Sequence, residues 1–273
     1  MAFVDFRNVW LAYNDELLAA GHYAVEDISL QVEEGEFIAI VGPSGCGKST
    51  FMKLTTGLKM PSKGSITIGG QPVTGPLKIS GMAFQAPSLL PWRTTVDNVL
   101  LPLEIVEPYR SSFKSRRKEY EARARELLKS VGLGGYEDKY PWQLSGGMQQ
   151  RASICRALVH EPKMLLLDEP FGALDALTRG TIQDELMAIV RQTQQTVFMI
   201  THDVDEAILL SDRILLMGNG HESAGQYVPG GLAEVVINPL PRERTRAQLH
   251  HLSGYYELRN HIVDFLVSRA KAH

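Results

Sequence analysis

The sequence has few cysteines, no long hydrophobic run and no excess of positive charge. Its two cysteines, Cys46 and Cys155, form neither a CxxC pair nor a spacing of metal ligands, which excludes a disulfide framework and favours a reducing compartment. The net charge of −3 argues against a nucleic-acid binder that relies on a basic surface. Apolar runs such as Phe37–Val41 are far shorter than the ~20 residues of a membrane-spanning helix, and the first residues lack the pattern of a signal peptide. We therefore expect a chain that neither crosses a bilayer alone nor is exported.

The residues that are present are those of an ordinary globular protein. Hydrophobic residues make up 44% of the 273 residues and charged residues 22%, enough for one large domain or a domain with a subdomain. Alternating apolar residues over 3–40 predict short strands, and the run Phe37–Val41, apolar on both faces, predicts a central parallel strand. Later strand patterns at 164–167, 196–200 and 213–217 alternate with helical patterns at 178–194 and 203–210, which indicates a parallel sheet.

Three further segments complete the expected organisation. Residues 86–150 form a mostly helical insertion, in which the charged stretch Ser111–Val131 reads as an amphipathic helix with a solvated polar face. The glycine-rich piece 218–231 is expected to be irregular, and the arginines at 242, 244 and 246 to belong to a charged linker. A final helix follows, with one apolar face made by Tyr255, Leu258, Ile262, Phe265 and Leu266.

A glycine-rich motif directly after the buried strand carries the strongest chemical signal. It matches G-x-x-x-x-G-K-[ST] and comprises Gly42, Pro43, Ser44, Gly45, Cys46, Gly47, Lys48 and Ser49. Glycines allow backbone amides to turn inward around phosphate oxygens, and the N-terminus of the following helix adds a positive dipole. In this pattern the lysine reaches the β- and γ-phosphates and the serine hydroxyl ligates Mg²⁺. The alternative, a plain glycine turn before a helix, is weak for a complete motif in this context.

Two acidic residues, Asp168 and Glu169, follow the apolar run at 164–167. Ligands bind at the carboxyl ends of strands in doubly wound sheets, so Asp168 is a candidate to hold Mg²⁺ and Glu169 to polarise an attacking water. Such a pair alone is more often a solvated turn. Beside a phosphate-binding loop, the functional interpretation is favoured.

The segment Leu144–Arg151 resembles a second anion site. Ser145 followed by Gly146 and Gly147 predicts a helix N-terminus with exposed amides. Without other motifs, an ordinary serine cap is the preferred interpretation.

Together these motifs resemble the nucleotide-binding subunit of an ABC transporter. The phosphate loop, Gln85, Leu144–Gly147, Leu165–Pro170, Ala173–Asp175 and Thr201–Asp203 occur in that family's order and approximate spacing, over roughly residues 3–217. The resemblance implies an α/β fold with a P-loop NTPase parallel-sheet core, an N-terminal antiparallel β subdomain and a helical insertion. It implies a nucleotide-binding domain over 1–237, with the helical subdomain at about 86–150, and a helical extension over 238–273.

The resemblance also implies a role for each matching residue. Lys48, Glu169 and His202 are expected to act in ATP hydrolysis, with His202 contacting the γ-phosphate, and Ser49, Gln85 and Asp168 to hold Mg²⁺. Tyr13 is expected to stack on adenine, although Tyr23 and a plain packing role stay open. The residues implied to touch ATP, in this subunit or across a dimer, are Tyr13, Gly42, Pro43, Ser44, Gly45, Cys46, Gly47, Lys48, Ser49, Thr50, Gln85, Ser145, Gly146, Gly147 and Asp175. Met148 departs from the common family pattern, which has glutamine there.

The implied partners are a second ATPase subunit and a permease. The family dimer is head-to-tail, either a homodimer or a pair with a homologous subunit, and separate transmembrane permease subunits and, indirectly, a solute-binding protein complete an importer. No nucleic acid is expected. Finer patterns, such as Leu89–Arg93 and Tyr255–Arg259, resemble the nitrate/sulfonate/taurine importer group, at the cytoplasmic face of the inner membrane. Residues 87–102 are the expected permease contact, although Leu89, Leu90 and Trp92 are equally consistent with internal packing.

Two other functions are weighed against the importer. A soluble ABC ATPase acting on DNA or ribosomes would carry a long coiled-coil insertion or a second cassette, and neither pattern occurs. A P-loop kinase acting on a small molecule would have no need for Leu144–Met148.

Overall fold

The computed structural model divides into two compact units. The first comprises Met1–Leu77 and Phe198–His273, and the second comprises Lys78–Val197. The structure describes residues 2–172, 174–223, 226–228 and 230–270, so Ala173 of the expected Ala173–Asp175 motif lies outside the described residues. The two units divide after Leu77 and before Phe198, whereas the sequence predicts domain boundaries near 86, 150 and 237. Those domain boundaries stay predictions.

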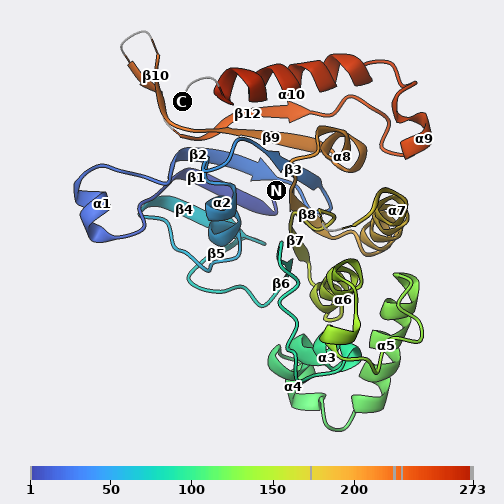
Figure 1. The fold of residues 1–273 in the computed structure, drawn as a ribbon. Helices are drawn as coiled ribbons and strands as arrows, with labels where there is room; N and C mark the ends of the chain where they lie inside the picture. Colours follow the sequence, from blue (N-terminus) through green and yellow to red (C-terminus); the bar gives the residue numbers. More distant parts are fainter. Residues whose placement is uncertain (1, 173, 224–225, 229, 271–273) are drawn as a thin grey trace. The chain divides into compact units, whose positions relative to one another are not determined.

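The first unit contains a four-stranded sheet, a two-stranded sheet and strands of a six-stranded sheet, together with the helices that flank them (Figure 1). Its strands are β1 (Val4–Leu11), β2 (Val25–Val32), β3 (Phe37–Val41), β4 (Lys63–Ile68), β5 (Gln71–Pro72), β9 (Arg213–Gly218), β10 (His221–Ser223), β11 (Gln226–Val228) and β12 (Gly231–Ile237). Its helices are α1 (Asp15–Ala19), α2 (Lys48–Thr55), α8 (Val204–Leu210), α9 (Arg246–Leu249) and α10 (Tyr255–Ala270). Strand β8 (Thr196–Ile200) crosses the division between the units.

The expected N-terminal antiparallel sheet is present, with β1 paired to both β2 and β4. The expected parallel strand is also present. All five residues of β3 are buried, and β3 pairs in parallel with β9. Antiparallel β12 covers the other edge of β9. In a strand that is buried on both faces, every side chain lies in an apolar environment. This explains the continuous apolar run of Phe37–Val41.

Helix α2 is anchored to the first unit by aromatic packing. The ring of Phe51 stacks on Phe6 of β1 with centroids 5.0 Å apart and packs at 5.9 Å against Phe198 of β8. All three side chains are buried. Because aromatic side chains bury large apolar areas, this stack holds the helix that follows the glycine-rich loop in a defined position.

The second unit is mostly helical, as expected for 86–150. Its strands are β6 (Ser80–Ala83) and β7 (Met164–Asp168), and its helices are α3 (Thr95–Ile105), α4 (Tyr109–Ser112), α5 (Arg117–Ser130), the 3-10 turn η1 (Pro141–Gln143), α6 (Gly146–Leu158) and α7 (Ala176–Thr193). Strands β6 and β7 pair in parallel. The single helix expected over Ser111–Val131 is wrong in detail. The chain leaves the helical path after Ser112, and α5 restarts at Arg117 with Tyr120, Ala124 and Leu128 buried.

The expectation that 218–231 is irregular is wrong. Strands β10 and β11 form an antiparallel pair within it, and β12 begins at Gly231. Gly231 has a φ of 130°, and an added Cβ there would lie 3.1 Å from the carbonyl oxygen of Glu26. Glycine in this segment therefore serves close strand packing rather than disorder.

Among the described residues, no helix is both long and apolar enough to span a membrane. The expected apolar face of the final helix is confirmed: Tyr255, Leu258 and Ile262 of α10 are buried.

The contact between β6 and α6 gives a stability prediction. A Cβ added to Gly81 would lie 2.0 Å from the carbonyl oxygen of Ala157, which is backbone and cannot rotate away. We expect Gly81→Ala to lower the free energy of unfolding by about 1–3 kcal/mol, the usual range for overpacking. Urea unfolding followed by circular dichroism measures this change. Gly75→Ala is the matched control because an added Cβ there meets nothing within 4 Å, and equal stabilities of the two variants would contradict the close packing.

Candidate functional site

The glycine-rich loop joins β3 to α2 by a turn that requires glycine at three positions. Gly45 and Gly47 have φ of 82° and 94°, in the left-handed region. A Cβ on Gly47 would lie 2.5 Å from Cγ1 of Val25, and one on Gly42 would lie 2.4 Å from the carbonyl oxygen of Met217 in β9. Side chains would therefore both strain and displace this turn. The loop ends at the N-terminus of α2, where backbone amides lack intrahelical partners and attract anions.

Lys48 brings a positive charge into this loop. Its side chain is 8% exposed, and its Nζ donates hydrogen bonds of 2.8 Å to the carbonyl oxygens of Gly42 and Pro43. The Cys46 sulfur lies 3.9 Å away, and burial raises the pKa of that thiol, so it stays neutral at pH 7. These described partners of Lys48 are all uncharged. The loop therefore brings an ammonium group next to the N-terminus of α2, and a cation beside a helix N-terminus is the chemistry that binds phosphate groups.

The residues after Lys48 lie at the start of α2. Ser49 is exposed, whereas Thr50 is buried and its hydroxyl lies 2.7 Å from the Tyr13 hydroxyl. The Tyr13 ring is 42% exposed beside this helix. Tyr23, the alternative, packs edge-on against Trp10 with centroids 4.9 Å apart. The geometry thus gives Tyr13 the better position for stacking near the loop, and its role with adenine stays a prediction.

His202 follows the end of β8 in the same unit. The amide of the preceding residue, Thr201, donates to the carbonyl oxygen of Ile40, two residues before the glycine-rich loop begins. The His202 side chain is exposed. Since the chain segments containing Ile40 and Thr201 lie side by side, His202 and the loop leave the sheet at one edge, where α/β sheets bind ligands.

In the second unit, the ends of β6 and β7 bring Gln85 to Glu169. The register pairs Ala83 with Leu167, and each site residue lies two positions beyond. The Gln85 Nε2 donates a hydrogen bond of 2.9 Å to Glu169 Oε2. Glu169 has a φ of 47°, a left-handed conformation that is rare for residues other than glycine. Such strain, at a half-buried carboxylate, is typical of functional positions.

The expected magnesium ligands have a suitable set of donors. The hydroxyl of Ser49, the amide oxygen of Gln85 and the carboxylate of half-buried Asp168 are hard oxygen ligands, which Mg²⁺ prefers. Gln85 uses its amide nitrogen for Glu169, which leaves its oxygen able to face a cation. The described residues contain no group of three or more His, Cys, Asp or Glu side chains arranged to hold a metal ion. The first unit thus offers the Ser49 hydroxyl as an oxygen donor, and the second unit offers the oxygens of Gln85 and Asp168.

Ser145 and Asp175 cap the helices that follow them. Ser145 Oγ accepts from the Met148 amide at 3.3 Å at the start of α6, and Asp175 Oδ1 accepts from the Thr178 amide at 3.0 Å at the start of α7. Both side chains are exposed. A Cβ on Gly146 would meet no atom of the chain within 4 Å. The 13-residue helix α6 thus presents an open N-terminus, with Ser145 and Gly146 exposed and Gly147 half-buried.

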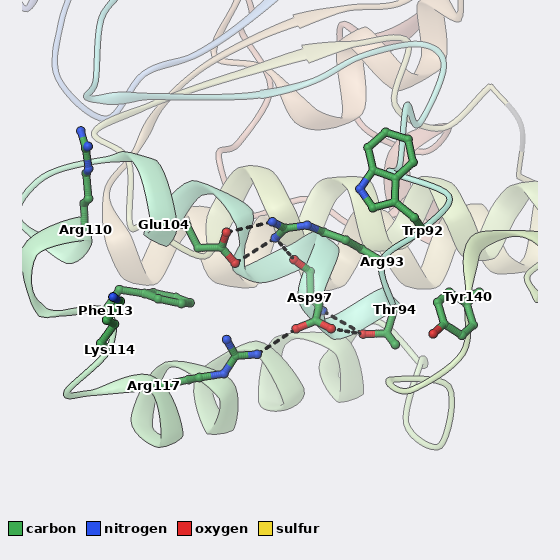
Figure 2. Close-up of a pocket in the computed structure, with 10 residues that line it drawn as sticks. All are labelled: Trp92, Arg93, Thr94, Asp97, Glu104, Arg110, Phe113, Lys114, Arg117 and Tyr140. Atoms are coloured by element: carbon green, nitrogen blue, oxygen red, sulfur yellow. Dashed lines mark hydrogen bonds and ion pairs between the residues drawn. The ribbon is translucent and has the colours of Figure 1, made fainter.

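A cleft of about 890 Å³ lies in the second unit beside the segment expected to contact a permease (Figure 2). Trp92, 71% exposed, stands at its rim, whereas Leu89 and Leu90 are half-buried. Thus Trp92 is available to a partner, and the two leucines are only partly so. The floor is polar, because Arg93 makes a two-pronged ion pair with Glu104 at 2.8 and 3.0 Å.

The structure groups the predicted residues within each unit. The first unit holds Tyr13, the loop through Thr50, and His202. The second unit brings Gln85 and Glu169 into contact and carries Asp168, Ser145–Gly147 and Asp175. Sequence reasoning missed the Gln85–Glu169 hydrogen bond and the ion pair of Arg93. The signal that could have revealed the Gln85–Glu169 hydrogen bond is the parallel pairing of β6 with β7. Finding it requires the positions of both strands in the sequence.

The comparisons with known proteins agree with these motifs. The family model described as ABC transporter matches residues 25–172, more than half of the chain. The chain belongs to the ABC transporter family. Its expected fold class, an α/β P-loop cassette with an antiparallel β subdomain and a helical insertion, is confirmed. A dimeric structure of a post-hydrolysis state of the ATP-binding cassette MJ0796, bound to ADP and Pi, superposes with a TM-score of 0.70 and 32% identity, covering 86% of this chain and 98% of that one.

Two curated relatives of this ABC family member refine the likeness. The nitrate import ATP-binding protein NrtC of Synechococcus elongatus is 45% identical, covering 94% of this chain but 37% of NrtC. The bicarbonate transport ATP-binding protein CmpD of Synechocystis is 42% identical, covering 98% of this chain and 90% of CmpD. The chain therefore spans about a third of the first relative and nearly all of the second. The resemblance to ATP-binding subunits of the nitrate importer group is confirmed.

Lys48 supports a direct binding prediction. We expect Lys48→Ala to weaken ATP binding by at least 10-fold, because removal of one charged hydrogen bond to phosphate costs about 1.5–3 kcal/mol. Isothermal titration calorimetry with Mg-ATP measures the change. Lys78→Ala, at an exposed lysine, is the matched control. Unchanged affinity of Lys48→Ala would contradict the assignment of this loop to phosphate.

Proposed function

We propose that the chain is the ATP-binding and ATP-hydrolysing subunit of an ABC importer. The observation that carries this proposal is the glycine-rich loop, in which the Lys48 ammonium has only uncharged described partners. A cation in such a cradle favours a phosphate chain over a neutral ligand. Membership of the ABC transporter family also supports an ATP-binding role for the chain.

Binding is divided among a few groups in this proposal. The amides of the loop and Lys48 hold the phosphates, and Tyr13 stacks on adenine with its hydroxyl beside Thr50. Ser49, Gln85 and Asp168 hold Mg²⁺. When bound, the ion neutralises charge on the phosphates.

Hydrolysis is assigned to Glu169 and His202. Water attacks the γ-phosphorus, its proton passes to the Glu169 carboxylate, and the bond between the γ-phosphorus and the β–γ bridging oxygen breaks to release ADP and phosphate. Gln85 orients Glu169 by its 2.9 Å hydrogen bond. His202 contacts the γ-phosphate and stabilises charge in the transition state.

The second anion site implies a second subunit. Ser145 and Gly146 are exposed and Gly146 faces open space, so these groups are accessible to a nucleotide held by another copy. We assign a head-to-tail homodimer, or a pair with a homologous ATPase, in which Ser145–Gly147 and Asp175 of one subunit complete the ATP site of the other. The dimeric state named for the similar cassette supports this arrangement.

The importer also requires membrane partners. The segment 87–102, with exposed Trp92, is the proposed contact for permease subunits, at the cytoplasmic face of the inner membrane. A solute-binding protein delivers the solute to the permease. The solute is assigned to the small nitrate, sulfonate or taurine kind that the sequence patterns imply, and the names of the relatives, which mention nitrate and bicarbonate, support a small solute. The solutes that stimulate ATP hydrolysis by the assembled complex test this assignment.

Replacement of Glu169 tests the catalytic assignment. We expect Glu169→Gln to lower kcat for ATP hydrolysis by about 100-fold or more, the usual effect of losing a general base, while ATP still binds. Phosphate release and calorimetry measure the two quantities. Glu161→Gln, at an exposed glutamate, is the control. Hydrolysis by Glu169→Gln at the wild-type rate would assign the base to another group.

Mixing two inactive variants tests the dimer. Ser145→Arg blocks the second anion site and Lys48→Ala disables the loop, so a mixed dimer keeps one intact composite site. We expect each variant alone to be inactive and an equimolar mixture to recover about a quarter of the wild-type rate if subunits pair at random. Ser130→Arg, at another exposed serine, should stay active. A mixture as inactive as its components would exclude sites completed by the partner.

A further inference from the structure

The residues after β12 hold both ends of helix α8, which begins two residues after His202. This extension was expected to include a charged linker at 242–246, and that expectation is wrong for Arg244, which is 8% exposed. Helix α10 packs on α8 within the first unit (Figure 1). The extension therefore belongs to the structure around α8.

At the N-terminal end of α8, two side chains of α10 bind one carboxylate. The Tyr255 hydroxyl donates to Asp205 Oδ1 at 2.7 Å, and Arg259 Nε donates to the same oxygen at 2.9 Å. Tyr255 is completely buried. A hydroxyl and a guanidinium on one carboxylate form charge-assisted hydrogen bonds, stronger than neutral ones.

At the C-terminal end of α8, two other side chains bind the carbonyl groups. Asn238 Nδ2 donates to the carbonyl oxygens of Ile208 and Ser211 at 2.8 and 2.9 Å. Arg244 Nε donates to Ile208 at 2.9 Å, and its Nη2 donates to Ser211. These bonds satisfy carbonyls that a helix end leaves without partners, and the arginine charge complements the helix dipole.

His202 is joined to α8 by a short network. Asp203 caps the helix, with its Oδ1 accepting from the Glu206 amide at 3.1 Å. Thr201 Oγ1 accepts from the Asp203 amide at 3.0 Å and donates to the Glu206 carboxylate. The residues on both sides of His202 are thus bonded to the first turn of α8, so movement of that turn moves His202.

Helix α8 has only seven residues. Isolated helices shorter than ~12 residues are marginal in water, so α8 depends on its surroundings for order. We propose that Asn238, Arg244, Tyr255 and Arg259 form a clamp that holds α8 and, through it, positions His202 for hydrolysis. These are positioning residues, and the proposal rests on the role of His202 given above.

The test combines clamp variants with loss of His202. Tyr255→Phe removes the hydroxyl and keeps the buried ring, and Arg259→Met removes the guanidinium and keeps the length of the side chain. The matched control is Tyr256→Phe, at the exposed neighbouring tyrosine. The double variant combines Tyr255→Phe with Arg259→Met, and the triple variant adds His202→Ala. ATP hydrolysis by the full chain is measured for the double variant, for His202→Ala alone and for the triple variant, with radiolabelled ATP to quantify low rates.

We expect the double variant to lower kcat about fivefold and to leave KM for ATP within about twofold, because the phosphate loop is unchanged. In the His202→Ala background the same two substitutions should change kcat by less than about 1.5-fold, because the residue they act through is absent. A variant that carries Arg259→Lys in place of Arg259→Met should keep a higher kcat than the double variant. Hydrogen exchange of the amides in 204–210 should accelerate in the double variant and stay slow in Tyr256→Phe.

An unchanged kcat in the double variant, or the same fold loss with and without His202, would overturn the clamp. Tyr255→Phe alone repeats the test if the melting temperature of the double variant falls. Failure of the underlying function would look different, because His202→Ala alone would then hydrolyse ATP at the wild-type rate.

Discussion

The turn from β3 to α2, to which the proposed function assigns the phosphates of ATP, is constrained by its close contact with neighbouring strands. Gly42 and Gly47 lie so close to Met217 and Val25 that side chains cannot be accommodated. The loop therefore depends on β9 and on the start of β2 as much as on its own sequence. The stack of Phe51 on Phe6 holds helix α2, which follows the loop.

The contact between Gln85 and Glu169 depends on the pairing of two parallel strands. Parallel strands end at the same edge of a sheet, so the residues after β6 and β7 meet although they are far apart in the chain. This places the Gln85 amide on the Glu169 carboxylate and fixes the orientation of one carboxylate oxygen. Glu169 has a left-handed backbone conformation directly after the last residue of β7. In the proposed function, this hydrogen bond orients the Glu169 carboxylate before ATP binds, which lowers the cost of reorganisation during hydrolysis.

The C-terminal segment shows how a short helix gains order from residues remote in sequence. Asp205 receives its hydrogen bonds from α10, some 50 residues later, and the carbonyl groups at the other end of α8 receive theirs from Asn238 and Arg244. Arg244 is buried because four hydrogen bonds to backbone carbonyl oxygens replace water around its guanidinium. A charged side chain can enter an interior when its donors are satisfied in this way.

The sequence by itself determined the phosphate loop, the buried strand before it, the helix caps at Ser145 and Asp175 and the membership in the ABC family. These features are local, because each follows from the residue types at a fixed spacing. Only the tertiary structure decided which partners the polar side chains take. The pairing of Gln85 with Glu169, the burial of Arg244 and the strands within 218–231 all depend on segments distant in the chain. A charged stretch has the same sequence pattern whether its arginine is solvated or buried. A glycine-rich stretch likewise has the same pattern whether it is irregular or paired as strands. Only the contacts made on folding distinguish these outcomes.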